Sequence, residues 1–524
     1  MARGLDLSCK ALPLRTKRAW RIFWALVLLV LSFFVVERTF QNDTFYVIKM
    51  GEAVLDYGVD FKDHWAWSAQ IGYNYPHIIY NVLIALTYRV SGFFGVYVSV
   101  IVCAYVLAMS TYYLLERIYI EVAEKNCPQL YPLVGMIVGV VILLNYKYYL
   151  IARPQAVSYI LWLWETWLIN RLLNTGKIRY GAGIFGLAVL CANIHATAWY
   201  FTFILFLPFF GSIYLTRFCR YLSGKGIRAP YCRIEELIIP ADNNELSNVR
   251  KLWLVMVCSF ASGLLSPARI CYTSVFKATS SRTTEYITEH KPLVLADMKY
   301  VLISLILFIV LVSLCRVKCR LDLLLLFCGT FVMAVAARRH VGLFVYIGWL
   351  GFYYLIFSLL CKLPSGSIDR VRKSVIPLLL TAALLVGGFL QFNAPFYGYK
   401  DPYYASDEAI DFLKENYDLS ELRIYNEYEY GAYMMFMDVP VFIDSRVNEY
   451  TKAFSPELER DVLNDYVTIW RLDDGWLDVI DYYDFDGYYI PKNCALYQAL
   501  MLMPDVETVW ENDNDNMVIL MTVR

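Results

Sequence analysis

The chain has 524 residues, of which 59% are hydrophobic and 18% are charged. Its apolar residues form repeated runs that are too long for the core of a soluble domain, so we expect an integral membrane protein. The formal net charge is zero, and the sequence has no phosphate-binding glycine loop, no zinc pattern and no basic stripe. This argues against nucleotide hydrolysis and against binding of nucleic acid.

About eleven apolar runs are long enough, or nearly so, to span a membrane. Several are shorter than the roughly 17 to 25 residues of a straight span, so we expect some spans to begin in the headgroup region or to be broken. The first run follows basic residues and lacks a small-residue cleavage site, which predicts a retained span. The shorter stretch 77–90 favours an interfacial helix. The runs lie at 20–37, 93–115, 132–149, 155–173, 180–193, 196–215, 252–266, 299–314, 321–337, 341–360 and 374–391.

The distribution of basic residues predicts the side of the membrane on which each loop lies. With eleven spans and a cytoplasmic N-terminus, the cytoplasmic segments hold 25 Lys and Arg, and the outside loops hold 13. All five histidines then fall outside. We therefore expect a multi-pass protein of the plasma membrane, whose membrane domain, 1–391, has large outside loops at 38–92 and 267–298.

The C-terminal part, 392–524, differs in charge from the membrane domain. It holds 27 Asp and Glu but nine Lys and Arg. Helix-like segments alternate with strand-like ones, including 422–425 and 439–443, which predicts a small α/β domain. The fold class expected overall is a polytopic α-helical membrane protein with an extracytoplasmic C-terminal α/β domain.

The first outside loop opens with Asp43, at the start of a stretch that ends at Gly58. Apolar residues recur in it at helical spacing, so we predict an amphipathic helix on the membrane surface. Asp43 lies at its N-terminal end, where the helix dipole favours a carboxylate. A plain N-cap would also explain this aspartate.

Three motifs follow one another in and after this loop. They are Asn-Asp-x-x-Tyr at 42–46, the surface helix that ends at Gly58, and Pro76-His77 followed by Leu-Ile-Ala-Leu at 83–86. Together they resemble the C superfamily of glycosyltransferases, polytopic enzymes that take sugar from a polyprenyl-phosphate carrier on the outer face. The usual Pro-Pro pair is Tyr75-Pro76 here, and the acidic doublet of some branches is Asp43-Thr44. The resemblance implies that Asp43 is the catalytic base.

Other motifs resemble a bacterial family of multi-pass proteins related to that superfamily. They are Ala152-Arg153-Pro154-Gln155, Asn193-Ile194-His195, 285–292, Arg338-Arg339-His340, 426–431 and 440–446.

Arg153, Arg338 and Arg339 are arginines at span ends on the predicted outer side, against the positive-inside trend. Because a planar guanidinium suits phosphate, we predict that they bind the donor phosphate. Lipid headgroups are the alternative partner.

A further set of residues is predicted to bind sugar hydroxyls or a divalent cation such as Mg²⁺ or Mn²⁺. Glu285 and Glu289 have the spacing of one helix face. A solvated loop face would also explain the acidic members. In the C-terminal domain, Asp444 and Arg446 fit either sugar binding or a turn ion pair. The full set is Asp60, Asp63, His64, His77, His195, Glu285, Glu289, His290 and His340.

The sequence thus predicts an inverting glycosyltransferase that moves a sugar from a polyprenyl-phosphate donor to an envelope glycan, lipid or protein. One alternative is a non-enzymatic membrane protein for envelope glycan binding or assembly. A transporter is disfavoured, because polar residues within the spans are few and the charges gather at one face.

Overall fold

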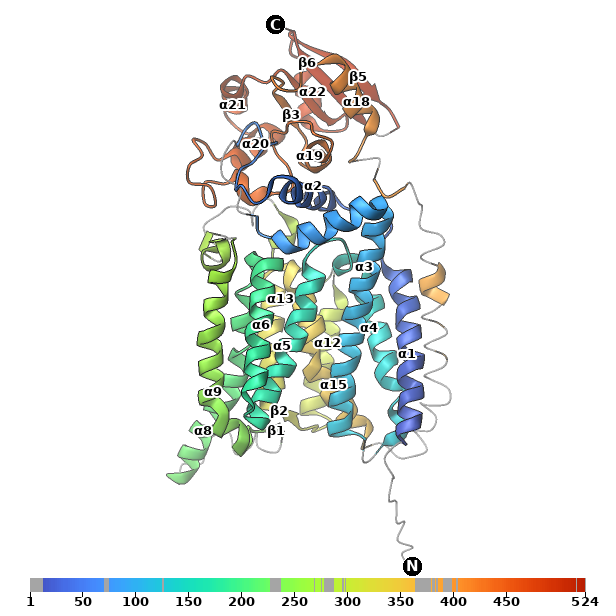
Figure 1. Cartoon of the computed structure of the whole chain (residues 1–524), viewed down its shortest axis with the longest axis vertical. Helices are drawn as coiled ribbons and strands as arrows, with labels where there is room; N and C mark the ends of the chain where they lie inside the picture. The colour runs from blue at the N-terminus through green and yellow to red at the C-terminus, as the bar shows by residue number, and fades with distance from the viewer. Residues whose placement is uncertain are drawn as a thin grey trace, which may run out of the picture.

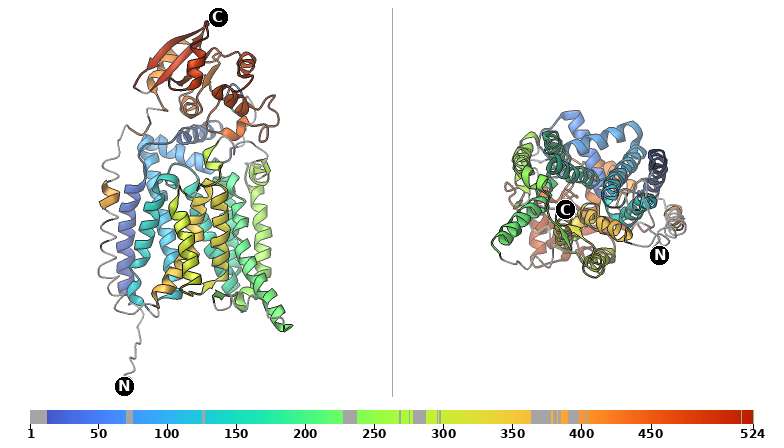
Figure 2. Two further views of the ribbon diagram at one scale, coloured as in Figure 1. Left: turned by 180° about the vertical axis from the view of Figure 1, so that it is seen from behind. Right: turned by 90° about the horizontal axis from the view of Figure 1, so that it is seen from below.

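The structure is a computed structural model in which a bundle of helices carries a smaller α/β unit at one end (Figure 1). Figure 2 shows the same arrangement from behind and from below. The residues that it describes are 13–69, 75–124, 127–226, 237–267, 269–274, 276–277, 287–294, 296, 298–362, 378, 382, 385–389, 398–401, 404–514 and 516–523.

Within the described residues, five helical segments are long and apolar enough to cross a membrane, and four shorter helices are also apolar. The five are Leu14–Val35, Ile78–Val122, Ala196–Gly224, Asn243–Leu265 and Arg338–Leu360, and the four are Pro128–Leu143, Ile178–Ile194, Lys299–Ser313 and Leu321–Ala336. Most of the predicted span 374–391 lies outside the described residues, so the count of about eleven stays a prediction.

The helices of the bundle lie side by side along the long axis of the molecule (Figures 1 and 2). A short parallel pair of strands, β1 and β2, lies at the end away from the α/β unit. The elements are α1 (Leu14–Val35), α3 (Ile78–Val122), α4 (Leu133–Tyr149), α5 (Gln155–Thr175), α6 (Ile178–Ile194), α7 (Phe201–Ile204), α8 (Leu207–Gly224), β1 (Ile238–Ile239), α9 (Asn243–Phe260), α12 (Lys299–Ser313), β2 (Cys319–Arg320), α13 (Leu321–Ala336), α14 (Val341–Leu343) and α15 (Trp349–Leu360).

Helix α3 is kinked, with non-helical backbone at Ser91 and Gly92. Gly92 has φ 59°, a left-handed conformation that glycine adopts without a steric penalty. The part before the kink lies across the end of the bundle, and the part after it runs along the bundle (Figure 1). This geometry agrees with the interfacial helix predicted for 77–90.

Helix α2 (Asn42–Tyr57) lies between the bundle and the α/β unit (Figure 1). It ends at Gly58, whose φ is 80°. It packs closely on α3, because a Cβ added at Gly51 would lie 2.1 Å from the backbone oxygen of Asn81. The helix is therefore covered by α3 on one side and by the α/β unit on the other, and does not rest on an open surface.

Residues 404–523 contain a four-stranded sheet with the order β3-β4-β6-β5. Strand β3 pairs in parallel with β4, and the other two neighbouring pairs are antiparallel. The elements are α18 (Asp407–Asn416), β3 (Ile424–Asn426), α19 (Tyr428–Phe436), α20 (Val462–Arg471), α21 (Trp476–Tyr483), β4 (Gly487–Pro491), α22 (Ala495–Leu500), β5 (Val506–Asn512) and β6 (Met517–Thr522).

The first loop is joined to this unit by backbone hydrogen bonds. Val441 donates to the oxygen of Trp65 over 2.9 Å, and Trp67 donates to the oxygen of Val441 over 3.1 Å. The segment 439–443 was predicted as a strand of the domain, but it makes only an isolated parallel bridge between Val441 and Ala66. Its partner is thus the loop of the membrane domain.

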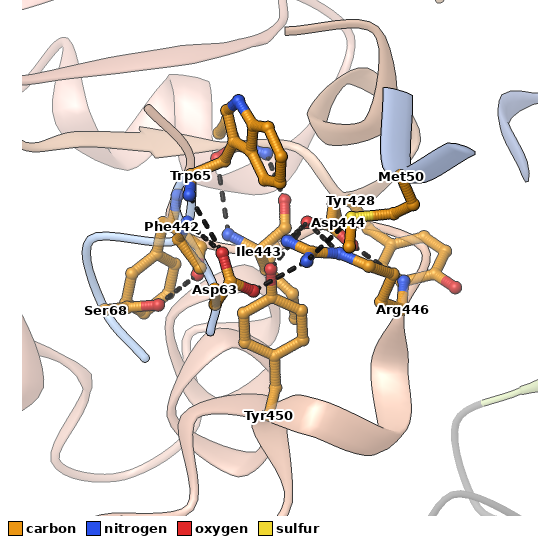
Figure 3. A network of polar contacts seen from close by, with 12 residues as sticks. Met50, Asp63, Trp65, Ser68, Tyr428, Phe442, Ile443, Asp444, Arg446 and Tyr450 are labelled. Carbon is orange, nitrogen blue, oxygen red and sulfur yellow. Dashed lines mark hydrogen bonds and ion pairs between the residues drawn. The ribbon is translucent and has the colours of Figure 1, made fainter. Parts of the chain in front are cut away.

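A buried ion network reinforces this junction (Figure 3). Arg446 lies 2.6 Å from Asp63 on the loop and 2.6 Å from Asp444 on its own unit. Tyr450 donates to Asp444 over 2.7 Å. Asp63 of the first loop thus joins three side chains of the segment 444–450, which ties the α/β unit to the end of the bundle.

Candidate functional site

A cavity of about 1120 Å³ lies at the junction between the bundle and the α/β unit. Its membrane-domain wall comes from the start of α2, the ends of the bundle helices and the loop 287–290. The opposite wall comes from the α/β unit. The predicted residues that line it are Asp43, His77, Arg153, His195, Glu289, His290 and Arg339.

Arg153 joins two carboxylates at the centre of the membrane-domain wall. Its Nε lies 2.7 Å from Asp43 Oδ2, and its Nη1 lies 2.7 Å from Glu289 Oε1. The side chains of Arg153 and Asp43 are each 19% exposed. Because its charge is already shared between two acids, Arg153 is a poor candidate for the principal phosphate-binding cation.

Asp43 lies in the first turn of α2 and faces this arginine. Burial raises the pKa of Asp43 above its ordinary value, and this outweighs the lowering by Arg153. The Ser445 side chain, from the α/β unit, also acts to lower it. For Glu289 the net shift is the reverse: burial raises its pKa, but Arg153, His290 and Arg339 together lower it by more. Of the two acids, Asp43 is therefore the stronger base.

Arg339 is held by imidazoles instead of carboxylates. Its Nη1 lies 3.0 Å from Nε2 of His290, and its Nε lies 3.4 Å from Nε2 of His340. The other nitrogen of His340 lies 3.2 Å from the carbonyl oxygen of Met333, which fixes Nε2 as the acceptor. Burial, and then Arg339, lower the pKa of His290 to about 4. Both histidines thus orient the guanidinium without neutralising it.

His77 and His195 form a second pair, with ring centroids 5.1 Å apart. The Ser158 hydroxyl lies 2.8 Å from His195 Nδ1 and 3.2 Å from the oxygen of Pro154, so it links the histidine to the start of α5. Burial lowers the pKa of His77 to about 3, so both rings are neutral hydrogen-bonding groups near pH 7.

A second cavity of about 410 Å³ adjoins the first, because five residues, Arg153 and Arg339 among them, line both. Its other lining residues are mostly apolar or aromatic, including Tyr159, Leu293 and Met298. Arg338 lines this smaller cavity and not the larger one. The cations therefore stand where a polar space meets an apolar one.

Other predicted residues lie elsewhere. Asp60 and His64 pair with each other at 2.6 Å on the first loop and do not line the large cavity. Asp63 forms a buried ion pair with Arg446, so its role in the structure is to stabilise the junction. His340 reaches the site only through Arg339.

Glu285 lies outside the described residues, so its predicted sharing of a helix face with Glu289 is untested.

Several residues of the α/β unit that line the cavity were not singled out from the sequence as site residues. Glu429 accepts a hydrogen bond from Asn42 over 3.4 Å, and Tyr466 and Trp470 add aromatic surface. Burial, and then the charge of Glu429, raise the pKa of Glu427 to about 8. The acidic and aromatic run 426–431 was the available signal, but nothing in it indicated that it faces Asp43.

A divalent cation does not fit the arrangement of these side chains. In the part of the chain that the structure describes, no three His, Cys, Asp or Glu side chains group closely enough to hold a metal ion. Asp43 and Glu289 have a guanidinium between them where a shared cation would need to lie.

The chain matches no protein-family model and no curated protein sequence. It does match solved structures. An oligosaccharyltransferase from Archaeoglobus fulgidus aligns over 91% of this chain and 69% of its own, with TM-score 0.55 and 10% identity. ArnT from Cupriavidus metallidurans, bound to undecaprenyl phosphate, aligns over 96% and 98%, with TM-score 0.53 and 8% identity.

The arabinofuranosyltransferase AftD from Mycobacteria aligns over 98% of this chain but 40% of its own, with TM-score 0.54 and 12% identity. Another structure of the archaeal enzyme, with TM-score 0.54 and 11% identity over 91% of this chain and 70% of its own, holds an inhibitory peptide and a dolichol-phosphate. These likenesses show the fold. The chain shares its fold with these solved structures, which agrees with the resemblance of the first-loop motifs.

Proposed function

We propose that this protein is a membrane glycosyltransferase that moves a sugar from a polyprenyl-phosphate donor to an acceptor held against its α/β unit. The observation that carries the proposal is the convergence of Asp43, Arg153, Glu289 and Arg339 on one polar cavity that opens into an apolar one. The shared fold supports glycosyl transfer in general. Because fold alone does not fix function, these side chains carry the proposal.

Arg339 is the residue best placed to bind the donor phosphate. It stands at the boundary of the two cavities, and no described carboxylate lies within 4 Å of it. Its full charge is therefore available to a phosphate oxygen, with His290 and His340 fixing the orientation of its fork. The polyprenyl chain would follow the apolar cavity past Tyr159 and Met298.

Asp43 acts as the general base in this proposal. An acceptor hydroxyl that approaches the carboxylate transfers its proton to Asp43 as its oxygen attacks the anomeric carbon. The bond between that carbon and the phosphate oxygen breaks, and the leaving polyprenyl phosphate takes the electron pair and pairs with Arg339. One displacement of this kind inverts the anomeric centre. Arg153 positions Asp43 through the ion pair between them.

The wall formed by the α/β unit is the proposed acceptor surface. Carboxyl groups of Glu427 and Glu429 and the rings of Tyr466 and Trp470 line it. Aromatic faces and acidic hydrogen-bond acceptors suit sugar rings and their hydroxyls. This favours an envelope glycan, or a glycosylated lipid or protein, as the acceptor.

The proposal places the cavity on the extracytoplasmic face of the plasma membrane. The charge distribution puts the N-terminus in the cytoplasm and the α/β unit outside. Polyprenyl-linked sugars presented at the outer leaflet would then reach the apolar cavity from the membrane.

Binding of undecaprenyl phosphate to the purified full-length protein tests the donor site. Arg339→Gln should weaken binding by roughly 10- to 100-fold, because a charge-assisted hydrogen bond contributes about 1.5–3 kcal/mol. Arg89→Gln is the control, since Arg89 pairs with Asp56 on an exposed surface. Unchanged binding by Arg339→Gln, or an equal loss in the control, would refute the assignment.

A further inference from the structure

A third cavity, of about 330 Å³, lies at the end of the bundle away from the α/β unit. The last turns of α3 and α5, the start of α13, and α15 form it. Arg320, which lines it, belongs to β2 at that end of the molecule (Figure 1). It shares no residue with the two cavities of the proposed active site.

Three arginines line this cavity, but they differ in their partners. Arg320 is neutralised by Asp322 at 2.6 Å and by Glu121 at 3.1 Å. Arg117 and Arg171 have no described carboxylate within 4 Å and are exposed. Two unneutralised guanidinium groups therefore face one space.

Aromatic rings hold both of these guanidinium groups. Arg117 lies 4.7 Å from the centroid of the Tyr113 ring, and Arg171 lies 6.0 Å from that of Trp167. Tyr113 and Trp167 also contact each other, with centroids 5.9 Å apart. These rings orient the two guanidinium groups by cation–π contact, and the Tyr180 ring, 5.7 Å from Arg171, adds a further contact.

Apolar side chains form much of the remaining wall, beside Glu121, Thr166, Asn170 and Asn174. Leu114, Leu323 and Leu350 are buried side chains of three different helices that line it. Arg117 and Arg171 lie four or five residues before their helices end, which is about 6–8 Å at 1.5 Å per residue. Two cations at headgroup depth beside an apolar wall are complementary to a phospholipid, because they can pair with its phosphate while its acyl chain lies along the wall.

We propose that this cavity binds an anionic phospholipid of the leaflet opposite to the proposed active site. Its phosphate is held between Arg117 and Arg171, and an acyl chain lies along the apolar wall. The two amides Asn170 and Asn174, which also line the cavity, provide further donors for the headgroup. This inference does not depend on the proposed sugar transfer.

Native mass spectrometry of the detergent-solubilised full-length protein tests it. Palmitoyl-oleoyl phosphatidylglycerol, the phosphatidylcholine with the same chains, and inorganic phosphate are titrated separately. Wild type should retain phosphatidylglycerol over phosphatidylcholine. The double variant Arg117→Gln, Arg171→Gln should bind phosphatidylglycerol about 10- to 30-fold more weakly, from roughly 1 kcal/mol for each basic residue near the lipid surface.

The control is Arg179→Gln with Arg250→Gln, which removes two exposed charges that do not line the cavity. It should keep the preference of the wild type for phosphatidylglycerol. Equal retention of both lipids, an equal loss in the control, or binding of inorganic phosphate that phosphatidylglycerol does not displace would each overturn the proposal. Elution at the wild-type volume in size exclusion shows that the variants are folded.

Discussion

Removal of the Asp63 carboxylate should release the first loop from the α/β unit. Asp63 and Arg446 are 3% and 2% exposed, and Asp63 also accepts from the backbone nitrogens of Trp65 and Ala66 over 2.9 Å. Breaking a buried ion pair costs about 3–5 kcal/mol. Because Arg446 retains Asp444, we expect the lower end of that range, about 3 kcal/mol, for Asp63→Ala.

Hydrogen exchange of the Val441 amide measures this opening directly, since it donates to Trp65 across the junction. A loss of about 3 kcal/mol should speed its exchange by roughly 150-fold, because about 1.4 kcal/mol corresponds to a factor of ten. Asp60→Ala is the matched control, because its ion pair with His64 is partly exposed and contributes about 0–1 kcal/mol. Unchanged exchange in Asp63→Ala, or equal acceleration in Asp60→Ala, would refute the structural place given to Asp63.

Two other predictions concern the pH dependence of transfer and the topology. The pKa of Asp43 is raised by burial, so the rate should fall as pH drops through that value, which lies above the ordinary one. His290, with a pKa lowered to about 4, stays neutral from about pH 5 to 8. In His290→Gln the transfer rate should therefore still fall at low pH. If this fall disappeared in the variant, the titrating group would be His290 and not Asp43. A reporter that fluoresces only in the cytoplasm, fused to the C-terminus, should stay dark, whereas bright cells would reverse the proposed orientation.

Local sequence patterns predicted the elements that place the site. The apolar periodicity after Asp43 and the stop at Gly58 predicted α2, since helix formation and termination depend on neighbouring residues. The short stretch 77–90 was predicted as a helix separate from the apolar run at 93–115, and α3 is kinked between the two at Ser91 and Gly92. Arg153 and Arg339 stood out because basic residues at span ends on the predicted outer side oppose the usual charge distribution. Both line the cavity.

Contacts between distant segments were beyond such patterns. Nothing periodic relates Asp63 to Arg446, so the aspartate was grouped with Asp60 and His64 as a ligand candidate. The approach of Glu429 to Asn42 likewise depends on how the α/β unit docks on α2. Which side chains an arginine of the site contacts also depends on the tertiary fold. Arg153 pairs with two carboxylates, whereas Arg339 contacts two imidazoles.

The central claim, that Asp43 is the base of a sugar transfer, is tested most directly by Asp43→Asn. The substitution keeps the shape of the side chain but removes the base. We would measure transfer of labelled sugar from membrane lipid to the envelope fraction in cells with equal amounts of wild type or variant. The account predicts a fall of about 10²- to 10⁴-fold in the transfer rate. Near-normal transfer by the variant, or no transfer by wild type, would contradict it.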